Sequence, residues 1–193
     1  HECSSAASDV YKRQFYYQLK DDSDSDILAA VSTTSADLRF LDVDMWAENL
    51  VELSNHELPV VRRNLVPSLR EYFETFPDDT RKLLPVMWQD GDEVVRTRMR
   101  ELLIKMSDIS STQFGARITD LNQHGCDLSA LWRLMDARRK GSSEAWKSWL
   151  SGEGEMPETI ETMRHVSTMQ APEELPDLSE ALETLDEELG FLD

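Results

Sequence analysis

The sequence predicts an all-α protein made of antiparallel helical hairpins. Apolar residues recur at intervals of three and four through most of residues 37–150, which is the spacing of one face of a helix. Signals for strands are scarce, because the chain has no alternating β-branched runs and no Asn-Gly turn. Short polar stretches separate the helical patterns, as is typical of helices that pack antiparallel. A compact helical bundle is the alternative architecture.

The apolar spacing and the turn residues predict seven helices in order along the chain. Pro59 suits the first turn of the second helix, and Pro67 should bend that helix or divide it in two. The stretch 77–80 (Pro-Asp-Asp-Thr) should end the second helix and cap the third, and Gly125 should close the fifth. The predicted helices cover residues 45–53, 60–76, 83–88, 94–106, 111–121, 127–135 and 143–149.

An internal repeat relates successive helical hairpins at an offset of 34 residues. The tripeptide Val-Val-Arg stands at residues 60–62 and again at residues 94–96. Each hairpin leaves an apolar face that a neighbouring hairpin must cover, so a repeat of this kind predicts stacking. Fainter copies lie near Leu128 and near Ile27. Apolar residues match at the same offset in the pairs Leu50 and Leu84, Leu65 and Met99, Leu69 and Leu103, and Tyr72 and Met106.

Residues 83–96 resemble the repeating unit of the HEAT-repeat family of armadillo-like α-solenoids. They combine a leucine-rich first helix that contains a proline, an acidic turn, and a second helix that opens with Val-Arg. The resemblance implies a short α-solenoid of stacked hairpins. It also implies that Arg62, Asp92 and Arg96 form ion pairs that join neighbouring repeats.

Arginines of the predicted second helices are candidates for binding a partner. Arg63, Arg98 and Arg100 are not required by the repeat, so they either face solvent or meet an acidic protein on the inner face of the array. Two tryptophans near the end of the helical region are further candidates. Trp146 and Trp149 either cap the last hairpin or form an exposed anchor for another protein.

Negative charge is concentrated at one end of the chain. Residues 153–193 hold 13 acidic side chains and one basic side chain, which accounts for −12 of the net charge of −18. The total charge argues against binding to nucleic acid or to anionic lipid, both of which need a basic surface. No run of residues approaches the roughly 18–20 apolar residues of a membrane span. We therefore expect a protein as partner, with no nucleic acid and no membrane.

The acidic tail also contains a pattern typical of an amphipathic helix over residues 177–189. Its apolar positions recur at steps of four, three and four: Leu178, Leu182, Leu185 and Leu189. Such a helix is suited to docking in a groove, either on another protein or on the array of this chain. A solvated tail and a polar cap on the last repeat are the alternatives.

Composition divides the chain into four parts. Residues 1–14 are predicted to be non-native, because residues 4–14 resemble translated adapter sequence. Residues 15–36 form an acidic connector with a partial repeat, residues 37–152 the helical-repeat domain, and residues 153–193 the acidic tail. With the first part set aside, Cys126 is the single cysteine and no internal disulfide can form. This favours a reducing, cytoplasmic compartment.

No pattern of residues predicts chemistry. The histidines and cysteines lack zinc-site spacing, and the glycines form neither a phosphate-binding loop nor a dinucleotide-binding motif. We therefore predict no catalytic residue, cofactor or metal. The function predicted is a non-enzymatic scaffold for protein–protein interaction, as the C-terminal fragment of a longer protein. The alternatives are a regulatory or accessory subunit of an enzyme whose catalytic part is missing and, less favoured, a HEAT-like enzyme of DNA repair.

Overall fold

The computed structural model describes residues 24–40, 42–139 and 142–158, together with Gln14, Gln18 and Asp22. All regular structure in these residues is helical, and it belongs to one compact unit of the chain, His1–Thr159. The helices are α2 (Ser25–Thr34), the 3-10 helix η1 (Ser35–Phe40), α3 (Val43–Ser54), α4 (Pro59–Thr75), α5 (Pro77–Trp88), α6 (Glu93–Ile109), α7 (Ser111–Gln123), α8 (Ser129–Arg139) and α9 (Ser143–Leu150). The predicted all-α class is confirmed for this part of the chain.

All seven predicted helices are present as α3 to α9, but two details at prolines differ from expectation. α4 runs unbroken through Pro67, so the predicted division of this helix is wrong. Stretch 77–80 does not cap α5, because Pro77 is itself its first residue and Phe76 precedes it without a side-chain cap. Proline is favoured at the first helical position, where its missing N–H is not needed.

The 34-residue repeat seen in the sequence also sets the positions of the helices. α3, α5 and α7 begin at residues 43, 77 and 111, and α2, α4 and α6 begin at residues 25, 59 and 93. α2 with η1 spans 25–40, which matches the 59–75 of α4 one repeat later. α8 begins at Ser129, two residues later than the repeat predicts.

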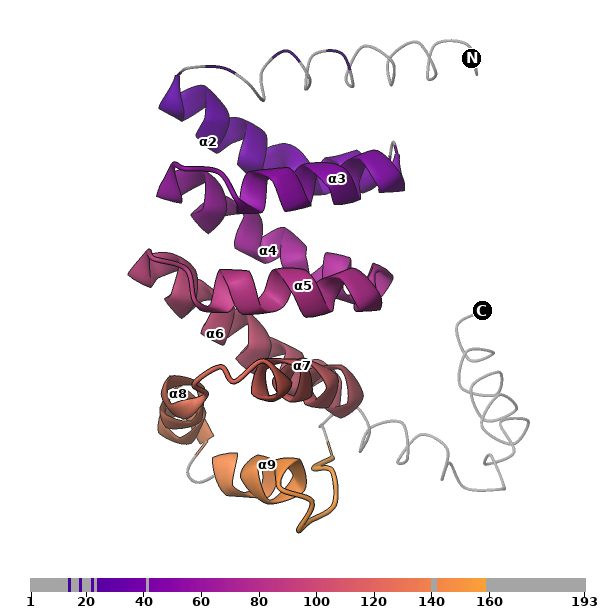
Figure 1. Ribbon diagram of the computed structural model, residues 1–193, viewed down its shortest axis with the longest axis vertical. Coiled ribbons are helices and arrows are strands. Elements are labelled where there is room, and N and C mark those ends of the chain that lie inside the picture. Colours follow the sequence, from indigo (N-terminus) through magenta and orange to yellow (C-terminus); the bar gives the residue numbers. More distant parts are fainter. Residues whose placement is uncertain are drawn as a thin grey trace, which may run out of the picture. The chain divides into compact units, whose positions relative to one another are not determined.

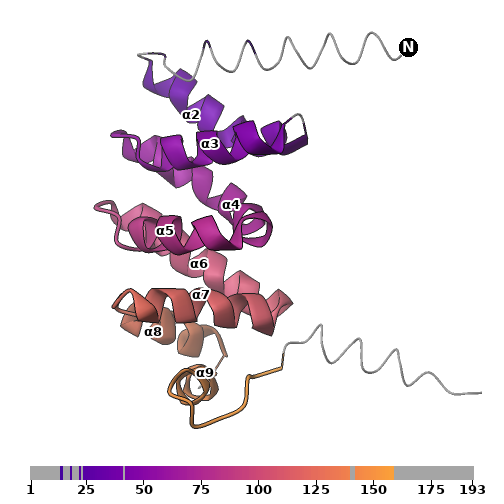
Figure 2. The same ribbon diagram turned by 45° about the vertical axis from the view of Figure 1, so that its right-hand side comes forward.

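Each helix packs on the equivalent helix of the neighbouring hairpin. α4 contacts α2 on one side and α6 on the other, and α6 contacts α8; α5 contacts α3 and α7, and α7 contacts α9. Figures 1 and 2 show the resulting arrangement, in which successive hairpins lie one below the other. The odd-numbered helices from α3 to α9 therefore form a first layer, and the even-numbered helices from α2 to α8 form a second layer.

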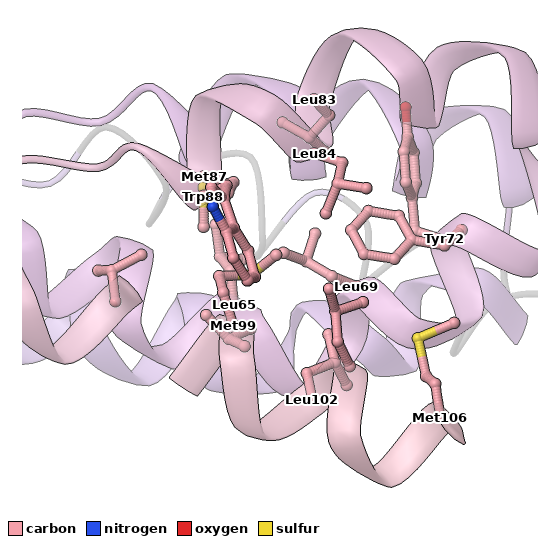
Figure 3. Packing of buried hydrophobic residues seen from close by; sticks show 14 of the residues in the cluster. Leu65, Leu69, Tyr72, Leu83, Leu84, Met87, Trp88, Met99, Leu102 and Met106 are labelled. Atoms are coloured by element: carbon pink, nitrogen blue, oxygen red, sulfur yellow. The ribbon is translucent and has the colours of Figure 1, made fainter. Parts of the chain in front are cut away.

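Equivalent positions of the repeat supply the core between the two layers. Leu50, Leu84 and Ile118 stand 34 residues apart on α3, α5 and α7, and all three are completely buried. Fully burying one such side chain contributes about 1.5–3 kcal/mol relative to leaving it exposed. Ile118 thus places α7 in the same register as α3 and α5, next to the fainter copy of the repeat near Leu128. Figure 3 shows the packing of Leu65, Leu69, Tyr72, Leu83, Leu84, Met87, Trp88, Met99, Leu102 and Met106.

Candidate partner-binding surfaces

Two ion pairs join the start of α4 to the turn between α5 and α6. Arg62 donates from Nε and Nη2 to the two carboxylate oxygens of Asp90, at 2.7 and 2.9 Å. Arg63 makes the same bidentate interaction with Asp92, donating from Nε and Nη2 at 2.8 and 2.5 Å. Both pairs span one repeat, so they hold neighbouring hairpins in register.

Two of the three arginine and aspartate residues that the resemblance implied do lie between neighbouring repeats. Arg62 and Asp92 link adjacent hairpins through ion pairs with Asp90 and Arg63. Arg96 makes no such link, because it pairs with Glu93 of its own helix and donates to the carbonyl oxygen of Asp90. The reason lies in the repeat, since the residue 34 positions after Asp90 is His124, which offers no carboxylate.

Hydrogen bonds keep both acceptor carboxylates charged. Burial tends to raise the pKa of Asp90, but hydrogen bonds from Arg62 and from the backbone N–H of Asp92 outweigh it and lower this pKa. The hydrogen bonds from Arg63 hold the pKa of Asp92 well below its usual value. Asp92 is also the N-cap of α6 and accepts from the N–H groups of Val94 and Val95, which adds to the effect.

The three arginines proposed for an acidic partner have different environments. Arg63 is committed to Asp92, as described above. Arg100 lies 3.3 Å from Glu93, with its guanidinium 6.0 Å from the centre of the Trp88 ring. Arg98 is exposed, and its Nη1 donates to the carbonyl oxygen of Arg63 at 2.7 Å. Of the three, Arg98 is therefore the one best placed to meet a partner.

The contact of Arg98 is itself part of the repeat. Asn64 stands 34 residues earlier and donates from Nδ2 to the carbonyl oxygen of Ala29, at 3.2 Å. The acceptors, Ala29 and Arg63, are also 34 residues apart. α4 and α6 are thus each tied to the preceding second-layer helix by an equivalent side-chain hydrogen bond, although the donor residue has changed.

Trp146 is not an exposed anchor, which corrects one of the two alternatives for it. Its ring is 4% exposed and meets Phe114 of α7 edge to face, at 4.6 Å between ring centres. Trp149 is half-buried and packs on Gly115, where an added Cβ would lie 2.9 Å from the indole ring. Both tryptophans are covered because α9 continues the first layer and packs on α7. The predicted apolar stripe Leu178, Leu182, Leu185 and Leu189 lies outside the described residues.

A groove lies between α3 and α5 and was not predicted. It has a volume of about 650 Å³, and Tyr72 of α4 contributes to its lining. Val51 and Val86, on its two sides, are 42% and 51% exposed. The remaining lining residues are Ala47, Glu48 and Glu52 from α3, Asn55 directly after α3, and Asp79, Lys82 and Leu83 from α5. The groove thus combines apolar surface with three acidic side chains and one basic side chain.

The corresponding space between α5 and α7 holds a charged cluster. Arg117 and Asp120 are both buried, with Nη2 and Oδ2 3.6 Å apart, and Arg81 of α5 approaches Asp120 Oδ1 at 3.5 Å. Neither Arg117 Nη1 nor Asp120 Oδ2 has a hydrogen-bond partner. Burial lowers the pKa of Arg117, against the opposing effect of Asp120.

No helix in the described residues has the length and apolar content to cross a membrane. In the same part of the chain, no three His, Cys, Asp or Glu side chains are grouped so that they could hold a metal ion. No family model matches the chain, and neither a curated protein nor a solved structure matches it significantly.

Proposed function

We propose that this chain is a non-enzymatic scaffold for protein–protein interaction, built as a short HEAT-like α-solenoid. The observation that carries the proposal is the register of 34 residues, which relates the starts of the helices and the bonds between hairpins. Stacked repeats contact only their neighbours and present continuous surfaces along both layers, which repeat proteins use to bind other proteins. In such an array the arginine pairs Arg62–Asp90 and Arg63–Asp92 are structural.

The second layer offers one surface for an acidic protein. Arg98 and Lys105 are exposed and stand seven residues apart, so they lie on the same side of α6. Arg133 of α8 is exposed as well. These cations provide a surface that steers an acidic partner.

Duplication of one repeat distinguishes a solenoid from a compact bundle. A second copy of residues 77–110, inserted after residue 110, should stack on the first copy because Arg96 then finds a new Asp90. We expect helix content, measured by circular dichroism, to rise in proportion to the added residues, with a single cooperative melt. A bundle has no place for an extra hairpin, so loss of the cooperative melt argues against the solenoid.

Affinity capture with the full chain tests the scaffold function. The double variant Arg98→Glu and Lys105→Glu should lose a partner that the original chain retains, whereas Glu153→Gln with Glu155→Gln should keep it. The proteins retained are identified by mass spectrometry. A chain that retains no protein specifically contradicts this function, and capture that is unaffected by the changes at Arg98 and Lys105 contradicts the role of the second-layer surface.

A further inference from the structure

The groove between α3 and α5 is open because three of its lining residues are small or apolar, whereas the equivalent residues one repeat later are charged. Residues 34 positions apart occupy equivalent places, so Ala47, Leu83 and Val86 correspond to Arg81, Arg117 and Asp120. In the space between α5 and α7 those three charged residues form the cluster described above. Between α3 and α5 the equivalent side chains are small or apolar, and about 650 Å³ stays unfilled.

The space between α5 and α7 shows that an arginine side chain and a carboxylate can be accommodated between two first-layer helices of this protein. There the long side chain of Arg81 extends from α5 to a carboxylate of α7, at 3.5 Å. Ala47 takes the place of this arginine in the open groove, so the chain itself supplies no cation from α3. A cation that enters from outside would meet carboxylates near the apolar surface.

The charges of the groove favour such a cation. Glu48 and Glu52 stand four residues apart on α3, and Asp79 faces them from the first turn of α5. Lys82, the one basic lining residue, is 85% exposed and lies 3.7 Å from Asp79. Tyr72 of α4 also lines the groove, and burial and, after it, the negative charge of Asp79 raise the pKa of this tyrosine. The groove therefore carries a net negative charge.

The apolar part of the groove favours side chains rather than a bare ion. Ala47 and Val51 line the groove one helical turn apart on α3, and Val51 is 42% exposed. Val86 lies on the opposite side and is 51% exposed, so the two valines leave apolar surface in water, which is typical of a binding site. The volume falls in the range of roughly 300–1,000 Å³ that is usual for ligand pockets.

We propose that the α3–α5 groove binds a segment of a partner protein that inserts an arginine or lysine flanked by apolar side chains. This inference rests on the proposed scaffold function and names the chemistry of its partner. Like charge argues against the chain's own residues 153–193 as the occupant, since they carry 13 acidic side chains. The groove is acidic, whereas the second layer is basic. The groove therefore recruits a basic segment, and the second layer an acidic protein.

Selection of peptides tests this proposal without knowledge of the natural partner. A phage-displayed library of random peptides of about 12 residues is selected on the full chain, and a representative peptide is labelled with fluorescein. We expect the selected peptides to combine Arg or Lys with a neighbouring Leu, Met or Phe. The affinity of the labelled peptide, measured by fluorescence anisotropy, should fall between about 50 and 500 mM salt because its cation is steered by charge.

Two variants test where the peptide binds. Ala47→Arg places the equivalent of Arg81 in the groove and should weaken binding about tenfold or more. Val94→Arg adds the same charge at an exposed valine of α6 and should leave binding unchanged. Because Ala47→Arg also changes packing, Glu48→Gln with Glu52→Gln tests the charge separately, against Glu153→Gln with Glu155→Gln as control. Thermal melts establish that each variant is folded.

Three outcomes would overturn the groove proposal. These are acidic peptides among those selected, no enrichment over the starting library, or binding that ignores both Ala47→Arg and the Glu48/Glu52 change. Peptides that bind elsewhere, and are lost with Arg98→Glu and Lys105→Glu, refute the groove but leave the scaffold function standing. A chain that captures no protein at all refutes the scaffold function, even if basic peptides bind the groove.

Discussion

Arg62 and Asp90 lie 28 residues apart in the sequence and are joined by two hydrogen bonds of 2.7 and 2.9 Å. The remaining guanidinium nitrogen donates to the carbonyl oxygens of His56 and Glu57, at 2.5 and 3.0 Å. One side chain thus ties the turn between α3 and α4 to the turn between α5 and α6. The two side chains are only 14% and 6% exposed, so the pair is sheltered from water.

Removal of the carboxylate from this pair should destabilise the array. Asp90→Ala leaves the guanidinium of Arg62 sheltered without a counter-charge, and we expect a loss of about 2–4 kcal/mol in the free energy of unfolding. Urea denaturation at neutral pH measures it. As a control, Arg70→Ala breaks an exposed pair with Glu74 and should cost less than about 1 kcal/mol. Similar losses in the two variants would contradict the structural role of Arg62.

Acid should weaken the protein through Asp92. Because the pKa of Asp92 is lowered in the folded state, the ionised form stabilises the fold above the unfolded-state pKa of about 3.9. This stabilisation is lost as the pH falls below about 4 towards the folded-state pKa. Urea denaturation at several pH values should show it, and Asp92→Asn should flatten the decline.

A second variant separates the ion pair from the helix cap. Arg63→Gln removes the hydrogen bonds that lower the pKa of Asp92 most but keeps the capping bonds to Val94 and Val95. It should flatten the acid decline in part, and Asp92→Asn should flatten it further. An acid decline that stays unchanged in Asp92→Asn shows that other carboxyl groups cause it.

The buried cluster between α5 and α7 should be replaceable by apolar residues. Arg117→Leu with Asp120→Val installs the side chains found at the equivalent positions Leu83 and Val86, and the incompletely paired charges disappear. Urea denaturation should show stability unchanged or raised by about 1–4 kcal/mol. Arg117→Leu alone leaves Asp120 buried with Arg81 at 3.5 Å and should destabilise. A double variant less stable than this single variant would contradict the equivalence of the two spaces.

Gly115 should be needed for the position of Trp149. In Gly115→Ala the new Cβ would lie 2.9 Å from the indole ring and 3.1 Å from the methyl carbon of Met156, so the ring has to move. We expect a change in near-ultraviolet circular dichroism and a red shift of tryptophan emission. Gly91→Ala, with no atom within 4 Å of the added Cβ, serves as the control. Equal spectra for Gly115→Ala and the original chain would rule out this close approach.

Much of the helical framework could be predicted from the sequence. The spacing of apolar residues identified α3 to α9, and the match of Leu69 with Leu103 identified two repeats whose buried positions coincide. The third repeat escaped because α8 starts two residues late and because Arg117 and Asp120 replace apolar residues in α7. The offset of 34 from Leu84 to Ile118 was the signal that could have revealed it.

The candidate surfaces were predicted less well. The sequence marked Arg63 and Trp146 as residues for a partner, but Asp92 engages one and Phe114 covers the other. No sequence motif marks the α3–α5 groove. Ala47 indicates an open space only when it is compared with Arg81, which occupies the equivalent position one repeat later.

The sequence by itself determined the helices, their 34-residue period and the faces that pack inward, because these depend on spacing within one helix or one hairpin. Only the tertiary structure decided which carboxylate each arginine meets and which gap between helices stays open. Those outcomes depend on side chains 28 to 39 residues apart, such as Arg62 with Asp90 and Arg81 with Asp120. The distance between stacked helices fixes which of these side chains can touch, and that distance is a property of the packed layers.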